Sequence, residues 1–149
     1  MPLTYDAAAD EIYGLLNDAW QAGAAAFNEG EVPRIVWPYK SESAPSVDTV
    51  WARVSRQTVR EGQSTLQDDG SKRYTSDGLL FVQIFAPLRD GKAGWRLQRL
   101  AMLARDCFRG QSTPGGVWFR NMRIQELKPD AKSYQIKVVT EYQYDEIGG

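Results

Sequence analysis

Gly78-Leu79-Leu80-Phe81-Val82-Gln83-Ile84-Phe85-Ala86-Pro87 is the stretch of this sequence that decides the fold. One set of its alternate positions is apolar throughout, and the other set is apolar except at Gln83. Because successive side chains of a strand point to opposite faces, both faces of this segment require cover. The sequence therefore predicts a central strand over residues 78–87, with helices or a second sheet packed against it.

Two amphipathic helices are predicted, one before and one after this strand. Apolar residues recur at three- and four-residue steps over residues 5–28, where Thr4 can cap the helix. The second helix opens after Pro87, with Asp90 as its cap, and ends at Gly110. Its apolar stripe should pack on the central strand and consists of Leu97, Leu100, Ala101, Ala104, Cys107 and Phe108.

The remaining strands are predicted from short alternating segments. They are residues 34–37, at an edge of the sheet, and residues 49–60, 117–127 and 133–145. The order of elements indicates an α+β fold, with a mainly antiparallel sheet of about five strands and two helices on one face. Residues 1–149 have the length and composition of a single domain.

A long projecting β-hairpin is expected between the second and the central strand. Residues 61–71 are polar and punctuated by glycine, so they are predicted to connect the two strands as a loop. We expect residues 57–73 to be mobile in the isolated subunit, because they offer little apolar surface to bury. Asp68 and Asp69 in this segment are better explained as turn residues than as ligands of a hard cation.

Composition excludes several classes of function. The chain has 18 Lys and Arg against 19 Asp and Glu, a net charge of -1, which provides no long-range attraction for nucleic acid or an anionic membrane. It has no histidine, and its single cysteine, Cys107, is better explained as a small buried residue than as a nucleophile. We therefore expect no metal and no cofactor. We also expect no membrane partner and a cytoplasmic place of assembly, because no signal sequence or apolar span is visible.

Two polar constellations are candidate functional sites. Residues 118–123, Trp-Phe-Arg-Asn-Met-Arg, mix aromatic and basic residues as an RNA-binding sheet does, but element order and charge favour a structural or subunit-contact role. Glu141, Asp145 and Glu146 could supply paired carboxylates for hydrolysis of a glycoside, but they are better explained as solvated residues of a terminal strand.

Five segments, which together span roughly residues 5–147, carry a resemblance to a known family. They are Trp51-Ala-Arg-Val-Ser55, the central strand, Ala101-Met-Leu-Ala-Arg-Asp-Cys-Phe-Arg-Gly110, Ser112-Thr-Pro-Gly-Gly-Val-Trp-Phe-Arg-Asn121 and Val138-Val-Thr-Glu-Tyr-Gln-Tyr-Asp-Glu-Ile147. The chain resembles the phage and prophage tail terminator-like proteins, a family formerly described as a domain of unknown function. The resemblance implies a structural protein, not an enzyme, that forms a ring, usually of six subunits, on the head-proximal end of the tail tube of long-tailed phages.

Such a ring stops growth of the tube and provides the surface for head–tail joining. The resemblance therefore implies three partners: further copies of the chain, the tail tube protein and a head–tail connector or neck protein. DNA would only pass through the lumen, and the protein would reside in the virion tail after assembly in the host cytoplasm. The alternatives are a tail-tube or connector subunit and a small nucleic-acid-binding domain or hydrolase.

The outer face of the second helix is the predicted interface. Trp95 and Met102 lie on the side opposite the apolar stripe, and they are flanked by Arg99, Arg105 and Arg109. Such a patch requires cover from a neighbour or from the chain's own residues 40–48. The second predicted contact, to the tube or a neighbouring subunit, is made by the hairpin tip, residues Gly62, Gln63, Leu66, Asp68 and Asp69.

Overall fold

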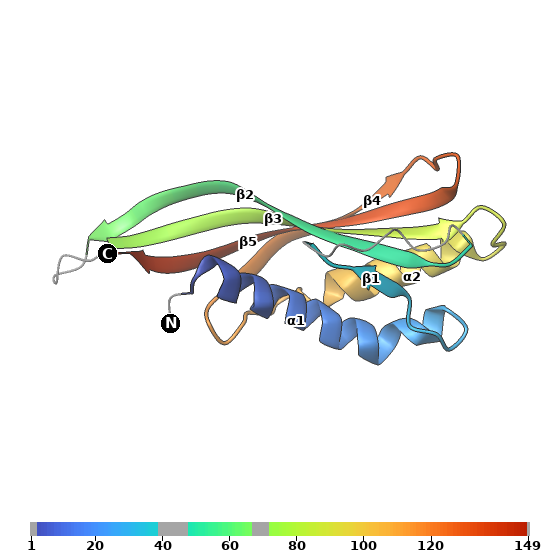
Figure 1. Ribbon diagram of the computed structural model, residues 1–149, viewed down its shortest axis with the longest axis horizontal. Helices are drawn as coiled ribbons and strands as arrows, with labels where there is room; N and C mark the ends of the chain where they lie inside the picture. Colours follow the sequence, from blue (N-terminus) through green and yellow to red (C-terminus); the bar gives the residue numbers. More distant parts are fainter. Residues whose placement is uncertain (1–2, 39–47, 67–71, 149) are drawn as a thin grey trace.

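Five strands form one sheet in a computed structural model that describes residues 3–38, 48–66 and 72–148. The strands are β1 (Arg34–Val36), β2 (Trp51–Leu66), β3 (Lys72–Pro87), β4 (Trp118–Leu127) and β5 (Ser133–Gly148). Their order in the sheet is β1-β2-β3-β5-β4, and every pairing is antiparallel except that of β1 with β2 (Figure 1). The predicted α+β fold and mainly antiparallel sheet are confirmed.

Strand β3 occupies the centre of the sheet, as its sequence predicts. Leu80, Val82, Ile84 and Ala86 are at most 1% exposed and face the helices. On the opposite face Phe81 and Gln83 are only half-buried, because no helix covers that face. The central strand therefore needs full cover on one face only, and its apolar reverse face is partly open.

Both helices lie on the same face of the sheet (Figure 1). Helix α1 (Tyr5–Gly23) begins after Thr4, whose hydroxyl accepts a hydrogen bond from the amide of Ala7 at 3.3 Å, and it buries Ala8, Ile12, Leu16 and Trp20. It ends five residues before the predicted boundary, and a short 3₁₀ helix, η1 (Ala24–Phe27), follows. The tighter turn brings the end of this segment against α2 instead of extending along the sheet.

Helix α2 (Ala93–Asp106) is shorter at both ends than the sequence predicts. The cap position is Lys92 and not Asp90, whose carboxylate instead accepts the backbone N–H of Lys92 at 2.9 Å. The helix ends at Asp106, and a turn closes at Gly110, which has a φ of 69°. The predicted stripe is buried as expected, except that Cys107, just past the helix end, is half-buried.

The projecting hairpin is built differently from the prediction. β2 and β3 stay paired as far as Leu66 and Lys72, so the predicted loop is wrong over residues 61–66, and β5 runs beside β3 to Gly148. Polar cross-strand contacts hold this part together: Thr75 donates to Asp145 at 2.8 Å and Ser76 to Glu61 at 3.4 Å. We call residues 58–66, 72–78 and 142–148 the arm; in Figure 1 it extends past the helices.

Gly78 marks the base of the arm and not the start of a strand. The ring of Tyr142, on the neighbouring strand β5, lies across β3 at this position. A side-chain carbon at Gly78 would overlap that ring, so a glycine is required by the close approach of Tyr142 and not by a turn.

Candidate interaction surfaces

Side chains of the described residues were compared with the needs of metal binding and of thiol chemistry. In residues 3–38, 48–66 and 72–148, no cluster of three or more His, Cys, Asp or Glu side chains is arranged to hold a metal ion. Neither α-helix in these ranges is long and apolar enough to cross a bilayer. The side chain of Cys107 is half-buried and donates to the carbonyl of Ala104 at 3.0 Å, and its burial raises the pKa of the thiol to about 12.

Cys107 is expected to react slowly with iodoacetamide at pH 8 in the folded protein and much faster in urea. Burial, together with the nearby Asp106 carboxylate, moves the thiol pKa from 9.0 to about 12, which lowers the thiolate fraction about a thousandfold. A time course of alkylation followed by mass spectrometry measures both rates, and equal rates would contradict the raised pKa of the half-buried thiol. The raised pKa also implies that stability from this group falls as pH rises above about 9.

The outer face of α2 carries the predicted interface residues, all of them in exposed positions except Arg105, whose side chain is 22% exposed. We call Trp95, Arg99, Met102, Arg105 and Arg109 the α2 patch. Trp95 is 49% exposed and Met102 is 38% exposed, so the prediction that they lie opposite the buried stripe is confirmed. The indole of Trp95 meets Phe27 edge-on, with 5.9 Å between ring centroids, and the Arg99 guanidinium lies 6.0 Å from the indole centroid.

The charges around this pair are partly balanced within α2 and the turn that follows it. Arg105 and Arg109 contact the carboxylate of Asp106 at 2.9 and 3.6 Å. The α2 patch is therefore an aromatic and thioether surface rimmed by paired charges, a composition typical of protein interfaces. Its use as an interface stays a prediction.

The five predicted hairpin-tip residues fall into two groups. Gly62, Gln63 and Leu66 lie in β2, in backbone pairing with β3 or next to it, so they belong to a strand and not to a loop. Asp68 and Asp69 lie outside the described residues, as do the residues 40–47 weighed as a cover for the α2 patch. Contact between the hairpin tip and another protein stays a prediction.

The acidic residues of β5 do not form a catalytic pair. Glu141 accepts from the amide of Asn121 at 3.0 Å and contacts Arg120 at 3.5 Å, whereas Asp145 is bonded to Thr75. Glu141 and Asp145 are four strand residues apart, about 13 Å, and Glu146 points to the other face. The three acids lie on the last strand as predicted, but each is only partly exposed, and Glu141 and Asp145 are hydrogen-bonded and not simply solvated.

Arg96 is a buried cation that the sequence analysis missed. It is 7% exposed, and its guanidinium contacts Asp90 and Glu29 at 2.9 Å each and donates to the carbonyl of Phe27 at 3.2 Å. The contact of Nε with Asp90 is an ion pair without hydrogen-bond alignment. Its burial could have been predicted from its position in the sequence, because Arg96 lies one turn before Leu100 on the buried stripe of α2.

The reverse face of the sheet is shielded by its own cations. Trp51 stacks on Phe85 with 4.2 Å between ring centroids, and the Arg53 guanidinium lies 5.2 Å from the indole centroid. The Lys137 ammonium lies 5.2 Å from the ring centroid of Phe81. These stacked cations cover aromatic surface that no helix covers, so this face presents charge to its surroundings.

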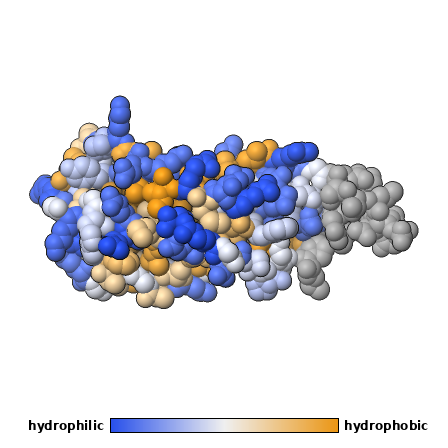
Figure 2. Space-filling view, turned by 180° about the vertical axis from the view of Figure 1, so that it is seen from behind, coloured by the Kyte–Doolittle hydropathy of each residue, from blue (hydrophilic) through white to orange (hydrophobic). Residues whose placement is uncertain are grey.

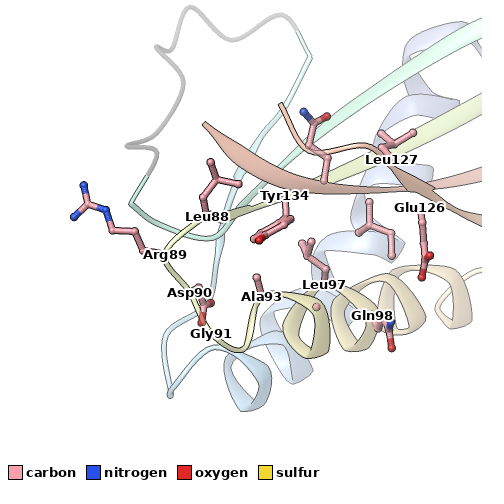
Figure 3. Close-up of a pocket in the computed structure, with 13 residues that line it drawn as sticks. Leu88, Arg89, Asp90, Gly91, Ala93, Leu97, Gln98, Glu126, Leu127 and Tyr134 are labelled. Atoms are coloured by element: carbon pink, nitrogen blue, oxygen red, sulfur yellow. The ribbon is translucent and has the colours of Figure 1, made fainter. Parts of the chain in front are cut away.

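A cavity of about 430 Å³ opens between the start of α2 and the adjoining ends of β4 and β5. Figure 3 shows Tyr134 between Leu88 and Leu97, and Arg89 pointing away from the cavity. We call this site the α2 cleft. Leu88 is 41% exposed and Tyr134 is 40% exposed, so apolar surface at the mouth is open. Figure 2 shows the molecule from the side opposite to Figure 1, and on that side a group of apolar residues is surrounded by hydrophilic ones.

Comparisons with known proteins identify the fold but no family. No family model matches the chain, and no curated protein matches it. Among similar solved structures, a chain described as the virion of a native gene transfer agent particle is 14% identical, with a TM-score of 0.52 over 95% of this chain and 99% of that one. A second structure, whose name states no function, is 14% identical, with a TM-score of 0.52 over 89% and 94%. At this identity the likeness establishes a shared fold.

Proposed function

We propose that the chain is a structural subunit of a phage tail or of a phage-like particle, and that it acts as a tail terminator. In this role it forms a ring, of six subunits by the family resemblance, on the head-proximal end of the tail tube. The ring stops polymerisation of the tube and provides the surface for head–tail joining. The observation that carries the proposal is the likeness, over nearly the whole of both chains, to a chain of a gene transfer agent virion.

The described surfaces suit a subunit of a ring. A ring requires two different surfaces on each subunit, because each copy contacts one neighbour with its front and the other with its back. The arm provides one projecting surface, and the α2 patch provides an apolar one with paired charges around it. The remaining surfaces would contact the tail tube protein and the connector or neck protein, and DNA would pass through the lumen.

Electron microscopy of the purified protein tests this function. We expect closed rings, and added tail tubes should carry a ring at one end and stop growing. Tubes that form from the protein alone would favour the alternative of a tail-tube subunit. Attachment to isolated connectors without capping of tubes would favour a connector subunit. Sub-micromolar, salt-sensitive binding of duplex DNA would instead favour a nucleic-acid-binding domain.

Changing Trp95 and Met102 together to serine is expected to abolish rings or tube capping. Trp95 is about half exposed and Met102 is 38% exposed, so the free energy of unfolding should fall only by about 0.5–1.5 kcal/mol, mainly through loss of the Trp95–Phe27 ring contact. Ring formation is scored by electron microscopy and stability by thermal melting. Val32→Ser, which removes an equally exposed apolar group elsewhere, is the matched control.

Two results would contradict this role of the α2 patch. A large loss of stability in the double variant would mean that the pair belongs to the core. Rings and capping that survive in a stable double variant would place the interface elsewhere on the surface.

A further inference from the structure

The reverse face of the sheet lacks a covering layer within the subunit. β3 carries apolar side chains on both faces, but Phe81 on the reverse face is only half-buried, whereas Leu80 and Val82 on the other are at most 1% exposed. Both helices lie on the side of Leu80 and Val82 (Figure 1). Because apolar side chains of a sheet are normally buried against another layer of structure, one layer is missing over the reverse face.

Two cations on this face, Arg53 and Lys137, have no carboxylate partner in the part of the chain that the structure describes. Arg53 is exposed, and its guanidinium lies 5.2 Å from the indole centroid of Trp51. The Lys137 ammonium lies 5.2 Å from the ring centroid of Phe81. Arg53, Gln83 and Lys137 form one row across β2, β3 and β5, so the two cations stand two strand spacings apart, about 10 Å. The reverse face therefore offers a pair of cations beside apolar rings.

The outer side of α1 carries the opposite charge. Residues 1–33 contain six of the 19 Asp and Glu residues of the chain and none of its 18 Lys and Arg residues. Asp10 and Asp18 are exposed on the side of α1 away from its buried stripe, and neither has an ion pair among the described residues. They are eight residues apart, about 12 Å along the helix axis. This spacing is close to that of the two cations on the reverse face.

Gly14 lies midway between Asp10 and Asp18 on the same side of α1. A side-chain carbon at this position would meet no atom of the described residues within 4 Å, so the subunit has room for a larger residue. Glycine destabilises the interior of a helix relative to alanine, and no contact within the described chain offsets that cost. A glycine does let another surface approach the helix backbone closely. A contact with a second molecule best explains a glycine at this position.

We propose that the outer side of α1 of one subunit packs on the reverse face of the next subunit in the ring, an inference that rests on the proposed ring. The two acids of this helix then lie against the two cations of the row, whose long side chains span the small difference in spacing. Gly14, midway between the acids, faces Gln83, midway between the cations. The helix supplies the missing layer over the reverse face, and the charges select its partner.

A second copy of the chain fits both the charge and the position of these surfaces. The helices lie on one face of the sheet and the two cations on the other, so the surfaces are on opposite sides of the subunit (Figure 1). A contact between two unlike surfaces is head-to-tail, and a series of such contacts closes into a ring when the rotation between copies allows it. The α2 patch lies in the same helix layer, since its Trp95 contacts Phe27 at the end of η1. One stacking contact can therefore include the α2 patch.

Charge reversal on each surface tests the contact. One double variant carries Asp10→Lys and Asp18→Lys, and the other carries Arg53→Glu and Lys137→Glu. Each alone places like charges face to face, so we expect its association to weaken at least about a hundredfold and sedimentation velocity to show monomers. Thermal melting verifies that both variants fold.

Mixing the two double variants is the decisive measurement. The reversed α1 of one variant then faces the reversed sheet of the other, and their two unmodified surfaces also remain complementary. An equimolar mixture is therefore expected to form rings in which the two variants alternate, with a 1:1 composition by native mass spectrometry. A mixture that stays monomeric overturns the proposal, as do rings formed by either double variant alone.

Lys128→Glu with Lys132→Glu is the matched control for the sheet variant. These exposed lysines lie in the turn between β4 and β5, so the control makes the same change of net charge away from the reverse face. We expect the control to form the same rings as the unmodified chain; if it loses them, net charge and not this contact is responsible. If the sheet variant keeps its rings and loses binding of duplex DNA, the occupant of the reverse face is DNA and not a second copy.

Gly14→Gln separates the contact from folding. Glutamine favours a helix more than glycine does, so the thermal stability of the subunit should rise or stay unchanged. The added side chain occupies the space that the neighbouring sheet needs, so rings should be lost. A Gly14→Gln protein that forms rings as well as the unmodified chain overturns the proposal.

The failure of this contact and the failure of the proposed function give different results. If both double variants form rings that cap tubes, the contact is wrong and the function stands. If the unmodified chain forms no rings and caps no tubes, the function is wrong. The contact is then tested by itself in a Cys107→Ser background that carries Gly14→Cys and Gln83→Cys. Disulfide-linked multimers under oxidising conditions support the contact, and monomers overturn it.

Discussion

Trp20→Ala is expected to lower the free energy of unfolding by about 3–5 kcal/mol. The indole of Trp20 is 0% exposed in the hydrophobic core, and its Nε1–H donates to the carbonyl of Pro33 at 2.8 Å. Truncation leaves a cavity too large for the neighbouring side chains to fill and a buried carbonyl without its donor. Domains of this size are stable by only about 5–15 kcal/mol, so this one change removes a large share.

Urea denaturation followed by circular dichroism measures this loss, and Trp20→Phe serves as the control. Phenylalanine keeps most of the apolar volume and loses the hydrogen bond, so we expect a loss clearly smaller than that of the alanine variant. Equal losses for both variants would show that the hydrogen bond, and not the packing, anchors α1 to the segment before β1.

Arg96→Met is expected to lower the free energy of unfolding by about 3 kcal/mol. The substitution keeps an apolar stem of similar length but removes the cation from Asp90, whose side chain is only 18% exposed, and from the carbonyl of Phe27. A largely buried carboxylate would then lack its counter-charge. Glu29 contributes little to the loss, because its side chain is 79% exposed.

A double variant separates the ion pair from simple packing. Arg96→Met with Asp90→Asn removes both charges together, so part of the stability should return relative to Arg96→Met alone. Arg99→Met, on the exposed side of the same helix, is the matched control and should change stability by less than about 0.5 kcal/mol. A double variant that is less stable than either single variant would contradict this account of Arg96.

Periodicity in the sequence was sufficient to predict which residues of the helices and of the central strand form the core. The alternation around Leu80 predicts the central strand, and three- and four-residue steps predict that Trp20 and Leu100 are buried, as the structure confirms. The same helical geometry places Trp95 and Met102 on the outer side of α2, and both are exposed. These inferences succeed because each depends on local geometry, which fixes the side of an element to which a side chain points.

Periodicity could not predict the polar part of the strands or the buried charge. Residues 61–66 have no apolar alternation, and their composition predicts a loop, whereas the structure pairs them with β3 in the sheet, with one polar cross-strand contact from Ser76 to Glu61. Arg96 occupies the buried stripe of α2, and its partners Asp90 and Glu29 come from segments that only folding brings together. A charge on a stripe becomes tolerable only when such partners are present.

By itself, the sequence determined the class of fold, the burial of its helices and central strand, and the exposed patch on α2. Only the tertiary structure decided that the α2 cleft forms between the start of α2 and the ends of β4 and β5, that β5 supports the arm and that Arg96 is paired. The physical reason is that burial within an element follows from the spacing of its own residues. The register between strands and the meeting of distant side chains depend on contacts between residues far apart in the chain.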